Sequence, residues 1–256
     1  MLNISLAAEK IGTIFGFPIT NSLLATWLVM TVLIVFSLAA TRKMSLVPSG
    51  LQSVAELIVG GLHDFFSSVT GHYVDKFFPL IASLFLFIIT ANWMGLLPGF
   101  STIGFYHTKE VVIAETNGEA PKKETETEFV PLLRGATSDL NTTIGLALVA
   151  VIAIQYFGFS LVGPHYGKKF LNFKDPISFF LGILESMSEV SRIISFAFRL
   201  FGNIFAGEVL LAVIAFLMPF LVPLPFLTLE LFVGFIQALV FSMLTAVFAN
   251  VAVSHE

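Results

Sequence analysis

Cysteine is absent from this chain of 256 residues, and charged residues are scarce. Without cysteine, the chain forms no disulfide and no thiolate metal site. Asp, Glu, Lys and Arg make up 12% of the residues, about half their share in soluble domains. The five histidines lack the spacing of metal ligands, and there is neither a basic patch nor a phosphate-binding loop. The sequence therefore predicts no metal, no cofactor, no nucleic-acid partner and no nucleotide site.

Long apolar runs replace the missing charges. Hydrophobic residues make up 56% of the chain, and 29 residues are Phe. A helix that spans a bilayer needs about 20 apolar residues, because unpaired backbone groups are costly in hydrocarbon. Runs of this length lie at 21–41, 77–98, 141–163 and from 176 to near the C-terminus. The first begins too late and is too long for a cleaved signal peptide.

The C-terminal run exceeds a single crossing and contains Pro219, Pro223 and Pro225. Because proline interrupts a helix, we expect two helices, at 176–218 and 226–253. At 1.5 Å per residue the first is about 64 Å long, so it must tilt, bend or lie partly along the surface. The predicted fold class is an all-α membrane protein with about five transmembrane crossings, whose last two helices form a long tilted hairpin.

Three segments are too polar to cross the bilayer. Residues 1–20 form a short lead-in, either amphipathic or irregular. Residues 47–70 are more amphipathic than apolar, which favours an interfacial helix. Residues 101–138 hold six Glu and four Lys or Arg, a composition typical of a solvated loop. No internal repeat is evident, so we expect residues 1–256 to form a single membrane domain.

Lys and Arg in short loops predict the orientation, because they accumulate on the cytoplasmic side of a membrane. If the spans alternate, these basic residues all fall on one side, which we expect to be cytoplasmic. The N-terminus and the 101–138 loop then face outward, and five crossings leave the C-terminus in the cytoplasm. The basic residues are Arg42, Lys43, Lys76, Lys168, Lys169 and Lys174.

Six ionisable residues interrupt the last two helices. A charge at mid-membrane costs about 2.5 kcal/mol or more, and such residues usually serve a function. On a helical projection, four of them and Asn203 lie within about 40° of one line, flanked by Ser188 and Ser195. Glu208 lies opposite Arg199, so we expect it to point toward a neighbouring helix of the same chain. The six residues are Glu185, Glu189, Arg192, Arg199, Glu208 and Glu230.

Ion pairing near the water boundary is an alternative explanation for part of this stripe. Glu185, Glu189 and Arg192 could form an ion-paired helix start without any role in transport. Arg199 is different, because apolar residues flank it on both sides and no basic neighbour marks an interface. On the last helix, Glu230 lies seven residues before a glutamine, so the two share one face.

These residues belong to a pattern that resembles subunit a of the rotary F-type ATP synthases. The segment SFAFRLFGNIFAGE at 195–208 is similar to the signature segment of that family. NWMGLLP at 92–98 is similar to the end of its second span, and SDLNTT at 138–143 to the start of its third. VPSGLQ at 47–52 is similar to its surface helix. The resemblance covers nearly the whole chain, with the segments in the same order.

The resemblance implies roles for single residues. Arg199 matches the arginine that faces the carboxylates of the rotating c-ring. Glu208 and Glu230 match positions on one aqueous half-channel, the second of which is His in some family members. The other matching positions are Asn203 and Gln237, close to the arginine, and Ser195 and Glu185, associated with the other half-channel.

The family also implies a mechanism without bond-making chemistry on this chain. Protons enter one half-channel, ride on ring carboxylates, and leave through the other, which turns the ring and drives ATP synthesis on other subunits. Arginine suits the junction because its guanidinium stays protonated and cannot relay a proton. It attracts a carboxylate by about 4 kcal/mol at about 4 Å in a medium of effective dielectric constant about 20. The implied partners are the c-ring, the b subunits of the peripheral stalk and the lipid bilayer, in a bacterial inner membrane rather than an organellar one.

Alternatives remain at the level of sequence. Glu208 and Glu230 could relay protons or simply share one structural proton between two helices. A secondary ion transporter also buries ionisable residues, but transporters usually show two related halves with broken helices, and no repeat appears here. A purely structural membrane subunit would not need the isolated Arg199. Whether the coupled ion is H⁺ or Na⁺ depends largely on the ring.

Overall fold

We describe the fold from a computed structural model that covers residues 8–14, 16–97, 100, 103–113, 122–170, 175–218 and 221–254. Five of its helices are long and apolar enough to cross a membrane, which confirms the predicted all-α membrane fold. Lys174 and Pro219 lie outside the described residues, as does the side chain of Lys168. The long helices and the strands are α1 (Asn21–Thr41), α2 (Leu51–Thr70), α3 (Val74–Gly95), α4 (Leu140–Val162), α5 (Pro176–Leu217), α6 (Pro223–Ser254), β1 (Lys10–Ile14), β2 (Phe17–Thr20), β3 (Gly104–Ile113) and β4 (Lys122–Pro131).

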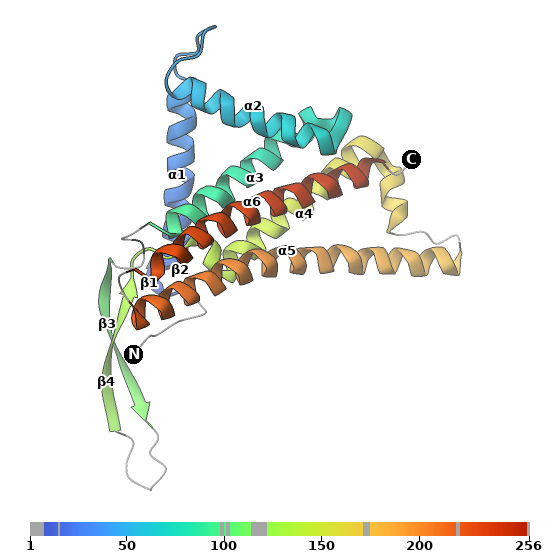
Figure 1. The fold of residues 1–256 in the computed structure, drawn as a ribbon. Coiled ribbons are helices and arrows are strands. Elements are labelled where there is room, and N and C mark those ends of the chain that lie inside the picture. The colour runs from blue at the N-terminus through green and yellow to red at the C-terminus, as the bar shows by residue number, and fades with distance from the viewer. Residues whose placement is uncertain are drawn as a thin grey trace.

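Two antiparallel strand pairs lie outside the helical body. β1 pairs with β2, and β3 pairs with β4 (Figure 1). They stand where the sequence suggests a short lead-in and a polar loop. The register of β3 with β4 sets Lys109 opposite Glu126 along the backbone. Glu and Thr alternate from 124 to 128, and this period of two is typical of a strand.

A short 3₁₀ turn, η1 (Gly71–Tyr73), separates α2 from α3. Gly50 and Gly71 flank α2 with positive φ angles of 60° and 55°, a region that residues with a Cβ rarely adopt. These two glycines therefore fix both ends of α2 as turns. The side chain of Gln52 secures the loop before α2, since its amide nitrogen donates to the Ser45 carbonyl oxygen at 3.0 Å and its oxygen accepts from the Ser45 backbone nitrogen at 3.1 Å.

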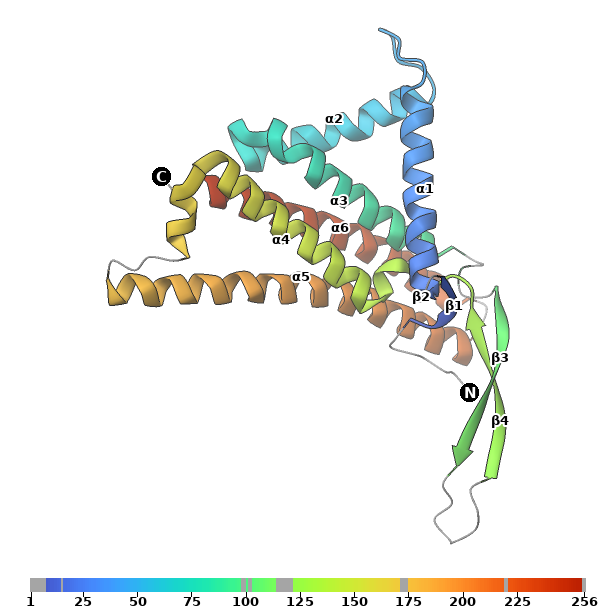
Figure 2. The same cartoon turned by 180° about the vertical axis from the view of Figure 1, so that it is seen from behind.

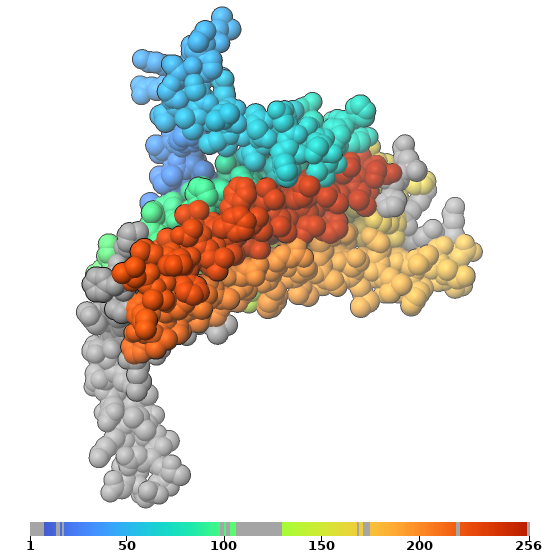
Figure 3. Space-filling model, viewed as in Figure 1, coloured from blue at the N-terminus to red at the C-terminus, as the bar shows by residue number. Residues whose placement is uncertain are grey.

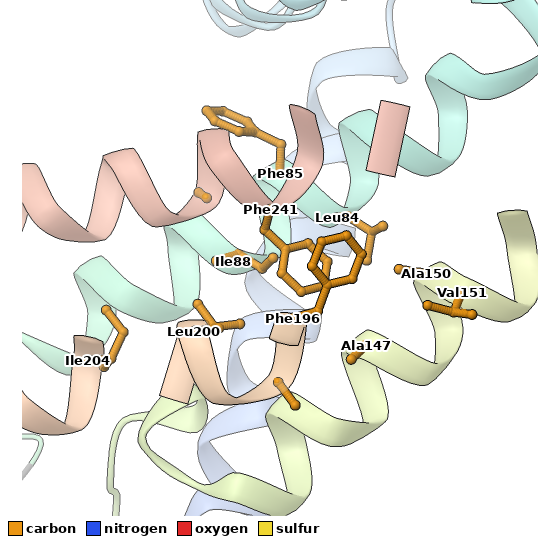
Figure 4. Close-up of a cluster of buried hydrophobic side chains, with 12 residues drawn as sticks. Leu84, Phe85, Ile88, Ala147, Ala150, Val151, Phe196, Leu200, Ile204 and Phe241 are labelled. Carbon is orange, nitrogen blue, oxygen red and sulfur yellow. The ribbon is translucent and has the colours of Figure 1, made fainter. Parts of the chain in front are cut away.

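The apolar core lies where α3, α4, α5 and α6 meet. Phe196 of α5 and Phe241 of α6 form its centre, with ring centroids 5.0 Å apart. Figure 4 shows Leu84 and Ile88 of α3 and Ala147 of α4 around this aromatic pair. Small residues on α4 let the helices approach closely, which is how membrane helices gain packing contacts without a hydrophobic driving force.

The two C-terminal helices lie side by side for much of their length (Figure 3). α5 has 42 residues, so it is about 63 Å long, roughly twice the thickness of the hydrocarbon layer. Seen from behind, α4 lies in front of α6, and its N-terminal end reaches the level of α5 (Figure 2). α5 therefore runs across the whole width of the helical body (Figure 1).

Candidate functional site

Two of the cavities along α5 together contain most of the ionisable residues singled out in the sequence. The first, which we call the arginine cavity, has a volume of about 290 Å³ and is formed by α5 and α6. The second, which we call the glutamate cavity, has a volume of about 310 Å³ and lies toward the C-terminal end of α5. The arginine cavity is lined by Ser188, Ser191, Arg192, Ser195, Phe196, Arg199, Leu244 and Phe248.

Arg199 and Arg192 line the same cavity but are held differently. Arg199 is exposed, and its Nη2 donates a hydrogen bond to Ser195 Oγ, one turn earlier on α5, at 3.2 Å. Within the described part of the chain, no carboxylate lies within ion-pair distance of Arg199. Arg192 Nη1 donates to both carboxylate oxygens of Glu189, at 2.7 and 2.8 Å, and its guanidinium lies 4.0 Å from the ring centroid of Phe248. One arginine is therefore neutralised by its own helix, whereas the other presents its charge outward.

Glu185 does not line the arginine cavity and pairs with a lysine outside α5. Its Oε1 lies 2.8 Å from Lys169 Nζ, on the 3₁₀ segment η3 (Gly163–Lys169) before α5. Both side chains are 30% exposed. The ion pairs proposed as an alternative for this end of α5 do form, in part within the helix and in part with η3. Arg199, which lies two turns beyond Arg192, takes no part in these ion pairs.

The glutamate cavity brings Glu208 of α5 and Glu230 of α6 together. Glu230 is 7% exposed, and a Cβ atom on Gly207 would collide with its carboxyl group. One oxygen of each glutamate, Glu208 Oε2 and Glu230 Oε1, is buried without a hydrogen-bond partner. Glu208 thus faces a neighbouring helix, as its position opposite Arg199 predicts. The cavity is lined by Ala91, Asn92, Gly95, Leu96, Leu97, Gly135, Thr137, Ser138, Ile204, Glu208, Leu211, Ala212 and Glu230.

Buried polar side chains hold the wall of the glutamate cavity. Asn92 of α3 donates through Nδ2 to the Gly234 carbonyl oxygen of α6 at 2.9 Å, and its Oδ1 accepts from Thr137 Oγ1 at 2.7 Å. Thr137 belongs to the 3₁₀ turn η2 (Ala136–Ser138). Asn92 is 4% exposed, and a buried amide that satisfies partners on both sides fixes their separation. The cavity is therefore built by three segments that are distant in sequence.

Arg134 is a member of the site that sequence reasoning missed. It lies between β4 and η2 with 7% exposure, and its Nε is 3.7 Å from Glu208 Oε1. In the sequence, Arg134 falls in a segment that we expect to be a polar loop, where basic residues are common and do not indicate a functional site. Its flanking residues, two leucines and a glycine, are the only local signal that it could be buried.

Asn203 and Gln237 line neither of the two cavities. Asn203 is exposed one turn beyond Arg199 on α5, and Gln237 is half-buried on α6. Among the described residues, no group of three His, Asp or Glu side chains is placed to hold a metal ion. The charged groups of the site are thus carboxylates and guanidinium groups, and in the described part of the chain they form no group of metal-ligating side chains.

The chain is similar to known proteins along most of its length. A family model described as ATP synthase A chain matches residues 23–250. The ATP synthase subunit a of Citrifermentans bemidjiense is 34% identical over 238 residues, which is 92% of this chain and 88% of that protein. The subunit a of Gloeobacter violaceus is 36% identical over 241 residues, 92% of this chain and 85% of that protein. The resemblance seen in the sequence is confirmed, and the chain belongs to the ATP synthase A chain family.

Proposed function

We propose that the glutamate cavity and the arginine cavity are two half-channels for protons, and that Arg199 separates them by engaging a carboxylate of a rotating c-ring. The chain acts as the fixed membrane subunit of a rotary ATP synthase. It makes and breaks no covalent bond apart from those of the transferred protons. ATP synthesis takes place on other subunits.

The exposed guanidinium of Arg199 is the observation that carries this proposal. A charge in the apolar part of a membrane is costly unless it is paired or reaches water. Arg199 lies on a helix rich in Phe, Leu and Ile, and within the described part of the chain its hydrogen-bond partner is the neutral hydroxyl of Ser195. Its counter-charge is therefore expected from another protein. A ring that carries one carboxylate per subunit supplies such a charge repeatedly as it turns.

The two functions of Arg199 follow from the chemistry of guanidinium. Because it stays protonated under all physiological conditions, it cannot accept a proton from one cavity and release it into the other. Its positive charge favours the ionised form of a ring carboxylate that passes it. A ring carboxylate that moves away into lipid must first take up a proton, because an ionised carboxylate there is costly. Rotation is thereby coupled to proton transfer.

Glu208 and Glu230 act as proton carriers on the way to the ring in this proposal. Carboxyl groups take up and release protons through their oxygens, and each has a buried oxygen without a partner. Two adjacent carboxylates repel each other, which favours a state in which one of them holds a proton. Asn203 and Gln237 are assigned to the ring-facing surface near Arg199. Ser195 and Glu185 are assigned to the second half-channel.

The proposed setting is a bacterial plasma membrane. Members of this family from bacteria are similar over most of the chain, and the multi-pass helical fold fits a bilayer. Arg42, Lys43 and Lys169 are assigned to the cytoplasmic side. The proposed partners are a ring of c subunits along α5 and α6 and the b subunits of a peripheral stalk.

Substitution of Arg199 by Ala tests the proposal. We expect ATP-driven proton pumping by the reconstituted complex to fall to background, because the ring carboxylate loses the fixed counter-charge that Arg199 supplies. Pumping is measured by quenching of a pH-sensitive dye in proteoliposomes, and co-purification with the ring verifies assembly. Phe216→Leu, at an exposed apolar position near the end of α5, serves as the control and is expected to retain pumping. Normal pumping by an assembled Arg199→Ala complex would rule out the assignment.

A further inference from the structure

Arg134 contacts the wall of the glutamate cavity at two points on α5. Its Nε lies 3.7 Å from Glu208 Oε1, and its guanidinium carbon lies 5.9 Å from the ring centroid of Phe205. Residues three apart share one face of a helix, so Phe205 and Glu208 contact the guanidinium from the same side of α5. The Arg134 side chain is 8% exposed. A permanent positive charge is therefore fixed beside one of the two carboxyl groups of the cavity.

The glutamate cavity otherwise offers what an inorganic cation needs. Glu208 Oε2 and Glu230 Oε1 are buried without hydrogen-bond partners, and Thr137 and Ser138 also line the space. Carboxylate, hydroxyl and carbonyl oxygens are the ligands preferred by hard cations. Among the described residues that line this cavity, Glu208 and Glu230 are the only ionisable ones. Without a nearby positive charge, these oxygens would attract sodium or potassium ions as well as protons.

We propose that Arg134 makes the glutamate cavity selective for protons over alkali-metal cations, an inference that rests on the proposed function. A proton that enters becomes part of a neutral carboxyl group, and the remaining carboxylate keeps its attraction to Arg134. A sodium ion retains its full charge inside the cavity and is repelled by the guanidinium. Fixed arginine charges exclude cations from other membrane pores in the same way. Since guanidinium does not lose its proton, the barrier persists at every physiological pH.

The test compares proton pumping in two salts of equal ionic strength. Reconstituted complexes carrying wild-type chain, Arg134→Gln, Arg134→Lys or Arg134→Gln/Glu208→Gln are measured in about 100 mM sodium chloride or choline chloride, so that screening is matched. We expect sodium to lower pumping by Arg134→Gln about threefold or more relative to choline, because the cavity gains one net negative charge. Wild type and Arg134→Lys are expected to pump equally in both salts.

The double variant separates this role from a structural one. Arg134→Gln/Glu208→Gln removes one charge of each sign, so its ratio of rates in sodium and choline is expected to return toward that of wild type, whatever its absolute rate. A purely structural role for Arg134 predicts equal losses in both salts. Equal rates for Arg134→Gln in both salts, or sodium sensitivity of Arg134→Lys, would overturn the inference. Pumping by wild type in choline reports on the proposed function separately.

A measurement on the wild-type complex covers the case in which Arg134→Gln does not assemble. At alkaline pH protons are scarce, so competition by sodium is strongest. Wild-type pumping is expected to remain equal in sodium and choline under these conditions. Inhibition or stimulation by sodium alone would show that the cavity admits the ion despite Arg134.

Discussion

The glutamate cavity and the arginine cavity differ in how much of their wall this chain supplies. α3, η2, α5 and α6 all line the glutamate cavity, and Glu230 within it is 7% exposed. Only α5 and α6 line the arginine cavity, and Arg199 within it is exposed. More segments of this chain therefore line the glutamate cavity than the arginine cavity. On the proposed function, substitutions in the glutamate cavity should act through the geometry of the chain, and those in the arginine cavity through contact with the ring.

Within the glutamate cavity, the largest effect is expected when a carboxyl group is replaced by an amide. Glu208→Gln should lower ATP-driven proton pumping roughly tenfold, because an amide cannot bind and release a proton as a carboxyl group does. This loss is smaller than that expected for Arg199→Ala, since Glu230 remains. Dye quenching in proteoliposomes measures the rate, and co-purification with the ring checks assembly. A greater loss with Glu208→Gln than with Arg199→Ala would contradict the assignment of Glu208 as one carrier of two.

A steric change in the same cavity should have an intermediate effect. A Cβ atom on Gly207 meets the carboxyl group of Glu230, so Gly207→Ala should displace that group and lower pumping several-fold. Because the displaced atoms end a flexible side chain, the helices themselves should remain packed. Gly145→Ala on α4 is the matched control, since a Cβ there meets nothing within 4 Å. Equal rates for both variants would show that the position of Glu230 is unimportant.

The smallest effect is expected at the Lys169–Glu185 pair before the arginine cavity. Both side chains are 30% exposed, and ion pairs open to water contribute only about 0.2–1 kcal/mol. Lys169→Gln should therefore change the pumping rate less than about twofold. Arg192→Gln is the companion variant and should lower the rate more, because it breaks an ion pair with two hydrogen bonds whose side chains are only 16% and 12% exposed. The reverse order would assign the main role at this end of α5 to Lys169.

Much of the helical fold was accessible from the sequence, because lipid imposes a simple rule. An apolar run long enough to cross the bilayer must form a helix. The positions of the long helices can therefore be predicted from the apolar runs in the sequence. The last helix begins at Pro223 rather than at the predicted residue 226. Proline is tolerated there because a backbone N–H in the first turn of a helix would have no intrahelical partner. The pairing of β3 with β4 was less accessible, since alternating Glu and Thr in a highly charged segment is equally compatible with a solvated loop.

The glutamate cavity shows what a single sequence leaves undetermined. Glu208 and Glu230 stand out as charges in apolar helices, and the opposite placement of Glu208 and Arg199 follows from helical periodicity. Arg134 lies in a polar segment, so its burial against Phe205 depends on tertiary packing. Asn92 is likewise one amide near the end of an apolar run, and its contacts with Gly234 and Thr137 join residues more than 40 positions apart. Periodicity describes one helix at a time and does not give such contacts.

The single hydrogen bond between Arg199 and Ser195 has a mechanical consequence. A guanidinium locked into several bonds would hold its position, and a carboxylate sweeping past would lose contact after a small displacement. Arg199 is anchored to its own helix by one neutral hydroxyl at 3.2 Å, and its long side chain has several rotatable bonds. On the proposed function, the Arg199 side chain should therefore follow a ring carboxylate over a short distance and then return to meet the next one. We expect the weak tether to give the stationary subunit a compliant contact with the ring.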